Sequence, residues 1–160
     1  MNRNTILGGT AALAIAGVFA IWYAGAGDTP PMAAAQPVDL AEGKALYAEN
    51  CAACHGAELE GQPDWQSPGP DGVLPAPPHS ADGHTWHHPD NVLFQYTKLG
   101  GKAALADQGV DFASGMPGFG NILTDQQIWN ILGYIKSTWP DRERAIQADR
   151  SAQARQQGGN

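Results

Sequence analysis

Two cysteines followed directly by a histidine constrain this chain more than any other feature. The run is Cys51-Ala-Ala-Cys54-His55, and it contains both cysteines of the 160-residue chain. Thiols three residues apart at the end of a helix lie about one turn apart on one side. That separation suits bonds to the two vinyl groups of one porphyrin, and it projects the His55 imidazole over the ring centre. The C-x-x-C-H pattern therefore predicts one covalently attached haem c, bound by Cys51, Cys54 and His55.

Three other interpretations of the cysteine pair remain open at this point. A thioredoxin-like redox pair is expected after a strand and at the start of a helix in a βαβ unit, whereas this pair follows a predicted helix. A zinc site could combine the pair with His84 and His88, but the gap from Cys54 to His84 exceeds the roughly 12–15 residues of a finger loop. A disulfide is the ordinary fate of two cysteines in an exported chain. The pattern favours haem over all three.

Iron held by one imidazole needs a sixth ligand or an open position, and Met116 is the leading candidate. It lies in the run Ser114-Gly-Met-Pro-Gly-Phe119, where glycine and proline favour a sharply turned loop that can present a thioether. A methionine that merely fills the core would lie on a periodic apolar face, and this one does not. We therefore expect His55 and Met116 to bind the metal.

Four histidines in one proline-rich loop compete with Met116 for the sixth position. They are His79, His84, His87 and His88. As surface or loop residues they need no metal. One of them could instead complete a His/His haem, or His84, His87 and His88 could hold a second metal such as copper or zinc.

Local signals predict three helices in the central part of the chain. Asp39 and Glu42 form a capping box at the start of a helix over Leu40–Asn50. A second helix is expected over Asp90–Leu99, and a third begins after Thr124, which Gln127 would cap reciprocally. The third helix carries an apolar stripe made of Ile128, Ile131, Leu132, Ile135 and Trp139.

The segments between and after these helices are predicted from glycine, proline and charge. Residues 58–89 hold too many prolines for a long helix, and residues 102–121 are expected to be irregular. Residues 141–157 are rich in Arg, Gln and Ala, so we expect a polar helix with little to bury.

The N-terminus carries an apolar segment that predicts export. Residues 6–27 contain no charge and follow Arg3. This length exceeds the roughly 7–15 apolar residues of a secretory signal and suits the roughly 20 that span a bilayer. We expect an uncleaved transmembrane anchor that leaves the rest of the chain outside, with signal cleavage near Ala33–Ala35 as the alternative. The predicted layout is an anchor at 1–27, a linker at 28–37, a haem domain at 38–139 and a polar C-terminal extension at 140–160.

The segment from Val38 to Trp139 resembles the class I cytochrome c family. Its elements follow the family order: a helix with Gly43 and Tyr47, the attachment motif, a proline-bearing loop, a middle helix, Met116-Pro117, and a last helix with Ile131 and Tyr134. The resemblance implies an all-α fold of about three to four helices around one haem. It also implies that the first and last helices cross at nearly right angles, with Gly43 allowing the close approach.

The resemblance further implies how the haem is held. His55 and Met116 would be axial ligands on opposite faces, and a backbone carbonyl in residues 75–78 would accept the proton of the His55 ring nitrogen that does not bind iron. The chain is most similar to exported or membrane-anchored bacterial monohaem cytochromes.

The expected function is single-electron transfer rather than catalysis. Residues 36–139 carry four Lys, no Arg and twelve Asp or Glu, a net charge of −8 that would repel nucleic acid. The expected partners are redox proteins, such as membrane respiratory complexes or periplasmic oxidoreductases, reached from the periplasmic side of the inner membrane. The alternatives are a haem sensor or peroxidase-like protein with a displaceable Met116, where His87 or His88 could act as acid or base, and a metal-handling cytochrome that uses His84, His87 and His88.

Overall fold

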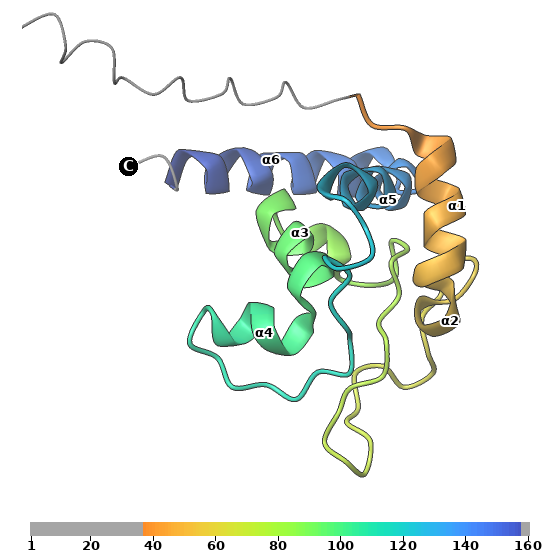
Figure 1. Ribbon diagram of the computed structural model, residues 1–160. Helices are drawn as coiled ribbons and strands as arrows, with labels where there is room; N and C mark the ends of the chain where they lie inside the picture. Colours follow the sequence, from red (N-terminus) through yellow and green to blue (C-terminus); the bar gives the residue numbers. More distant parts are fainter. Residues whose placement is uncertain (1–36, 158–160) are drawn as a thin grey trace, which may run out of the picture. The chain divides into compact units, whose positions relative to one another are not determined.

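The computed structural model describes residues 37–157, and within that range the chain is helical without a β-strand (Figure 1). The α-helices are α1 (Leu40–Asn50), α2 (Ala52–His55), α3 (Asp90–Leu99), α4 (Gly101–Ala106), α5 (Asp125–Ser137) and α6 (Asp141–Gln157). One 3₁₀ helix, η1 (Thr85–His87), lies in the proline-rich loop. The all-α class is confirmed, and the short helices α2 and α4 add to those expected.

The predicted membrane anchor and nearly all of the predicted linker lie outside the described residues. Among residues 37–157, no helix combines the length and the apolar character that crossing a bilayer requires. The anchor therefore stays a prediction.

A buried amide ties the start of α1 to α5. Asp39 caps α1 as predicted, because its side chain accepts hydrogen bonds from the backbone N–H groups of Ala41 and Glu42 at 2.9 and 3.0 Å. The reciprocal half of the predicted capping box is wrong. Asn130 of α5 replaces it: its Oδ1 accepts from the Asp39 N–H at 3.0 Å, and its Nδ2 donates to Glu42 Oε2 at 2.5 Å. Asn130 is only 1% exposed, so its buried amide finds hydrogen-bond partners at the exposed start of α1.

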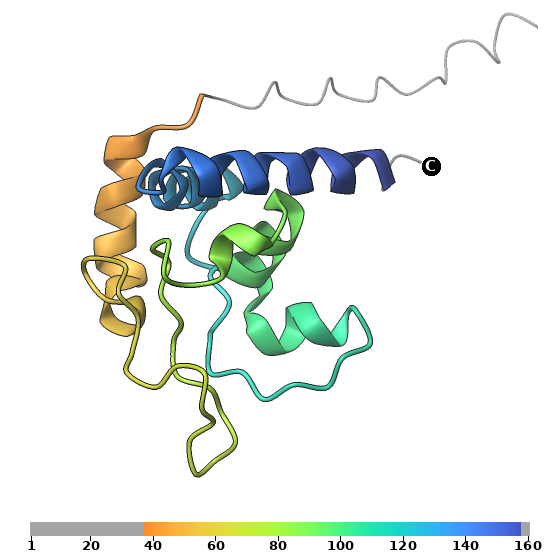
Figure 2. The same ribbon diagram turned by 180° about the vertical axis from the view of Figure 1, so that it is seen from behind.

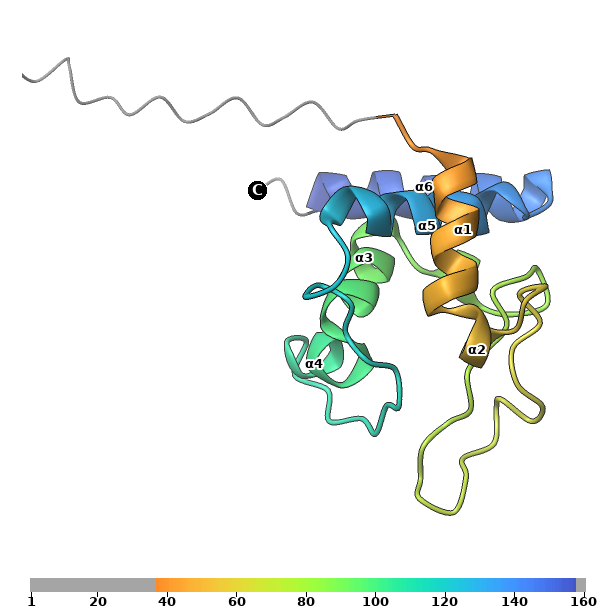
Figure 3. The ribbon, with the colours of Figure 1, turned by 45° about the vertical axis from the view of Figure 1, so that its right-hand side comes forward.

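Helix α1 crosses α5, as Figures 1 and 3 show, and Gly43 lies where the two helices touch. A Cβ atom on Gly43 would lie 2.0 Å from the backbone oxygen of Asn130, so only glycine fits this contact. Beside the crossing, the ring of Tyr47 packs 5.6 Å from the ring of Tyr134. The core around it consists of Tyr47, Leu59, Phe94, Leu123, Ile128, Ile131, Leu132, Ile135 and Trp139. The predicted apolar stripe of α5 is thus confirmed.

Helix α4 lies in the stretch that the sequence predicts to be irregular. Gly100 ends α3 with a φ of +86°, a value that favours glycine, and α4 begins at the next residue. No side chain caps α4, but the Gly101 N–H donates to the Met116 carbonyl at 3.1 Å. A tertiary contact, rather than a local signal, therefore marks the start of this helix.

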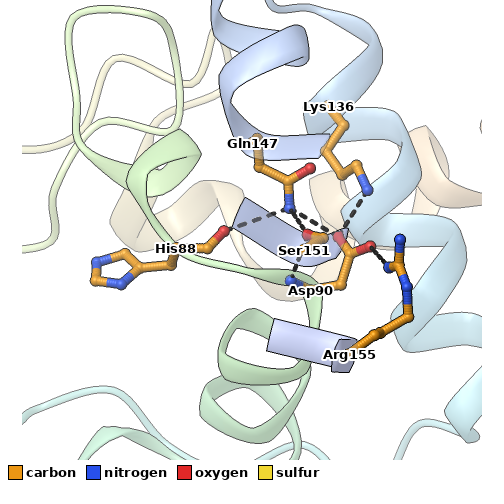
Figure 4. A network of polar contacts seen from close by, with 6 residues as sticks. All are labelled: His88, Asp90, Lys136, Gln147, Ser151 and Arg155. Carbon is orange, nitrogen blue, oxygen red and sulfur yellow. Dashed lines mark hydrogen bonds and ion pairs between the residues drawn. The ribbon is translucent and has the colours of Figure 1, made fainter. Parts of the chain in front are cut away.

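Helix α6 docks through polar side chains, as Figure 4 shows. Its helical bounds match the prediction, but the expectation that it buries little is wrong, because Gln147 and Ser151 are buried. Gln147 Nε2 donates to Asp90 Oδ1 at 2.8 Å, and the Asp90 N–H donates to Ser151 Oγ at 3.0 Å. Lys136 Nζ of α5 bonds the same Asp90 oxygen at 2.7 Å. Figure 2 shows α6 lying over the start of α3, where Asp90 begins that helix.

Asp90 stays ionised at the centre of this network. Burial alone would raise the pKa of its carboxyl. Hydrogen bonds from Lys136 and Gln147, together with the charges of Lys136 and Arg155, outweigh that effect and hold the pKa below its usual range. The ionised carboxylate is the form that accepts both side-chain hydrogen bonds.

Candidate haem-binding site

The attachment motif occupies one helical turn that continues α1 after a break at Cys51. The Cys51 N–H donates to the Tyr47 carbonyl at 2.9 Å, so α1 runs up to the motif. The Cys51 carbonyl then accepts from the N–H groups of Cys54 and His55, at 3.1 and 2.9 Å. The Tyr47 hydroxyl donates to the carbonyl of Gly56 at 2.8 Å and so holds the far end of the motif. The two thiols and the imidazole are therefore positioned by one short, anchored turn.

The thiols of Cys51 and Cys54 are both free, the first partly buried and the second exposed. Burial, and next the neighbouring Cys54, raise the pKa of Cys51 to about 11. A thioredoxin-like pair works through a thiol whose pKa is lowered, so this environment disfavours that interpretation. The pair also follows a helix, as the sequence indicates, rather than a strand.

The His55 imidazole is oriented by a backbone carbonyl of the proline-rich loop. Its Nδ1 lies 2.9 Å from the Pro77 oxygen, within the stretch 75–78 that the family resemblance implied. A carbonyl only accepts, so Nδ1 carries the proton and Nε2 keeps its lone pair. Burial lowers the pKa of His55, and the bond to Pro77 opposes this without reversing it. The ring is therefore neutral near pH 7, which is the form that binds a metal.

His79 is placed differently from what the sequence suggested. It was one of four candidate sixth ligands, but its ring stacks on His55 with centroids 4.0 Å apart and planes 20° apart. A ring beside His55 lies on the same side of any metal that His55 binds, so His79 is not in position to be the opposite ligand. Burial, followed by the charges of His55 and His84, lowers the pKa of His79 to about 3. It is a neutral ring packed against His55.

The remaining histidines do not come together as a metal site. His87 stacks on Trp86 with centroids 3.7 Å apart, and His84 lies against Trp65 and His88 at 5.1 and 5.4 Å. Within residues 37–157, no group of three or more His, Cys, Asp or Glu side chains is arranged to hold a metal ion. The hypothesis of a copper or zinc site at His84, His87 and His88 is therefore not supported by the geometry.

Met116 lies in a loop that is fastened to the junction of α3 and α4. The Met116 carbonyl accepts from Gly101, and the Phe119 N–H donates to the Thr97 carbonyl at 3.0 Å. The Met116 N–H donates to Ser114 Oγ at 3.3 Å, and its side chain is partly buried. Figure 3 shows α2 and α4 on different sides of the unit. The hydrogen bonds to Gly101 and Thr97 thus hold the Met116 loop at the junction of α3 and α4.

Residues 40–139 match the family model described as Cytochrome c. The chain belongs to the cytochrome c family. A domain of this family carries covalently bound haem c and serves electron transfer. No curated protein and no solved structure matched the chain. The match ends at Trp139, two residues before α6 begins.

The donor groups of this cytochrome fit haem c. Two free thiols on one turn can each add S–H across a vinyl C=C bond, which forms a thioether without an oxidant. The neutral His55 ring has its Nδ1 occupied by Pro77 and its Nε2 available for iron. Sequence reasoning missed Asn130, which joins α1 to α5, and it missed the role of the Tyr47 hydroxyl, which holds Gly56. It named His79 as a possible sixth ligand, whereas the structure places this ring against His55. The signal for that position is that His79 follows Pro77 by two residues.

Proposed function

We propose that this cytochrome is a monohaem electron carrier whose iron is bound by His55 and Met116 and whose haem is attached through Cys51 and Cys54. The observation that carries the proposal is the His55–Pro77 hydrogen bond, because it prepares the ring at the end of the C-x-x-C-H turn as a metal ligand. The Met116 loop supports the second ligand, since its backbone is held to α3 and α4 at both ends.

The haem supplies an iron that alternates between the ferric and ferrous states. His55 and Met116 would hold this iron between them, which would let electrons pass while excluding substrates. Pro77 raises the basicity of His55 because its carbonyl accepts a hydrogen bond from the Nδ1–H. A Met116 thioether raises the reduction potential relative to a second imidazole. The buried core around the motif lowers the local dielectric, which disfavours the extra positive charge of the ferric state.

The charge of the domain defines the kind of partner. A net charge of −8 over residues 36–139 suits a redox protein with a basic docking surface, such as a membrane respiratory complex or a periplasmic oxidoreductase. Redox encounters of this kind are small and short-lived. An N-terminal anchor on the periplasmic side of the inner membrane would raise the effective concentration of the domain near such partners.

The anchor has a direct test. Full-length protein expressed in a bacterium should stay in the membrane fraction after a high-salt wash, because about 20 apolar residues hold a helix in the bilayer. A chain that starts after residue 36, supplied with a cleavable signal, is the control and should be released as soluble periplasmic protein. If intact mass shows that the protein expressed from the full-length gene lacks its first 35 residues, the segment is instead a cleaved signal.

Met116→Ala tests the sixth ligand. The variant should retain covalent haem, bind carbon monoxide in the ferrous state, and lose the ferric absorption band near 695 nm that the family resemblance assigns to the sulfur–iron bond. Its potential should fall by on the order of 0.1 V, within the roughly 0.8 V over which axial ligands set haem potentials. Spectroelectrochemistry and carbon monoxide titration measure these changes.

Two controls make this test specific. Asn121→Ala changes an exposed residue of the same segment and should leave both the band and the potential unchanged. Met116→His should keep iron closed to carbon monoxide but still lower the potential. If the unmodified protein binds carbon monoxide readily, Met116 does not close the iron, and a sensor or peroxidase-like role replaces electron transfer.

A further inference from the structure

The face of the His55 ring is covered by a second imidazole. Iron at Nε2 and the Pro77 carbonyl at Nδ1 restrain the ring in its own plane, but neither contact supports its faces. His79 supplies that support, with ring centroids 4.0 Å apart and an interplanar angle of 20°. The edge of the Tyr47 ring lies on His79 in turn, with centroids 6.3 Å apart.

His79 is itself held at its ring and at its backbone. Its Nδ1 lies 2.8 Å from Thr85 Oγ1, and the Thr85 hydroxyl is 3.4 Å from the Pro78 carbonyl. Because that hydroxyl donates to Pro78, its oxygen accepts the Nδ1 proton of His79. At the backbone, the Trp139 indole N–H donates to the His79 carbonyl at 2.7 Å. Thr85 is buried, so the stacked ring cannot swing away without breaking its hydrogen bond to a buried hydroxyl. The Trp139 bond fixes the backbone from which the ring projects.

We propose that His79 is a positioning residue that fixes the angle of the His55 plane about its bond to iron. The inference rests on the proposed function, since it requires His55 to be the proximal ligand. A ring supported on its face keeps the same orientation in the ferric and ferrous states. Less rearrangement then accompanies each electron transfer, because the ligand is organised before the electron arrives.

Proton NMR of the ferric holoprotein tests this orientation. The order and spread of the four haem-methyl shifts depend on the angle of the axial imidazole plane. His79→Ala should change that order or give a second set of methyl resonances, because the unsupported ring adopts other angles. His79→Phe keeps an aromatic face against His55 and should preserve the order. Thr85→Val keeps the volume but removes the hydrogen bond that orients His79, so it should alter the pattern in the same direction as His79→Ala.

His87→Ala is the matched control, because His87 lies in the same loop and stacks on Trp86 instead of His55. Its methyl shifts should equal those of the unmodified protein. Unchanged shifts in His79→Ala would overturn the proposal. If His79→Ala yields no holoprotein, unchanged shifts in Thr85→Val would do so. Failure of the proposed function is distinguishable, because hyperfine-shifted His55 ring protons would then be missing from the unmodified protein as well.

Discussion

The double variant Cys51→Ala, Cys54→Ala is expected to contain no haem after denaturation and to lose its cooperative fold. The nine buried apolar residues form a small core, and residues 58–84 carry no helix or strand to hold themselves in place. A domain of about 100 residues with a loop of this length needs its largest apolar member, the haem, to complete the core. Intact mass after acid–acetone extraction and thermal melting by circular dichroism measure the two losses.

Ala53→Ser is the matched control for this experiment. It changes an exposed residue between the two cysteines and preserves the C-x-x-C-H pattern, so the added haem mass and the melting transition should both remain. Each single cysteine variant should keep one thioether and so retain haem mass. Haem that stays bound to the double variant through extraction would refute the thioether assignment.

Gly43→Ala should strongly destabilise the folded holoprotein. Helix propensity alone predicts the opposite sign, since alanine is favoured over glycine in a helix interior by about 1 kcal/mol. The steric clash outweighs this preference, because the new Cβ would lie 2.0 Å from the backbone oxygen of Asn130, which cannot move without the rest of α5. Separating the helices also disturbs the Asn130 bonds to Asp39 and Glu42. We expect a loss of about 3 kcal/mol in the free energy of unfolding, measured by guanidinium titration.

Lys44→Ala controls for the helix itself. Lys44 is the next residue of α1 and is exposed, so its substitution should change the unfolding free energy by less than about 0.5 kcal/mol. Equal stability of Gly43→Ala and the unmodified protein would show that α1 and α5 can move apart freely.

Several helices were predictable because their signals are local. The bounds of α1 follow from Asp39 and the motif at Cys51, and those of α3 from Pro89 and Gly100. The capping box of α5 is confirmed in full, with Thr124 and Gln127 bonded reciprocally. Helix α4 was missed because its start depends on the Met116 carbonyl, which lies 15 residues further along the chain.

In the candidate site, too, the features that depend on neighbouring residues were predictable and those that depend on distant residues were not. The attachment motif is contained in five consecutive residues, so its chemistry is visible in the sequence. The roles of Asn130 and His79 depend on partners that only the fold brings close. Glu42 satisfied the local rule for a capping box, yet it bonds Asn130, 88 residues away. Pattern rules describe neighbours in sequence, and they cannot exclude a better partner from another helix.

The polar underside of α6 makes the C-terminal extension separable from the domain that precedes it. The contacts in Figure 4 join Gln147, Ser151 and Arg155 to hydrophilic groups outside α6, namely Asp90 and the His88 carbonyl. Those groups can be solvated by water when the helix is absent. An apolar interface would instead become an exposed hydrophobic patch that promotes association. Removing such a helix would therefore leave water-compatible groups, rather than a new apolar patch, on the surface that it covered.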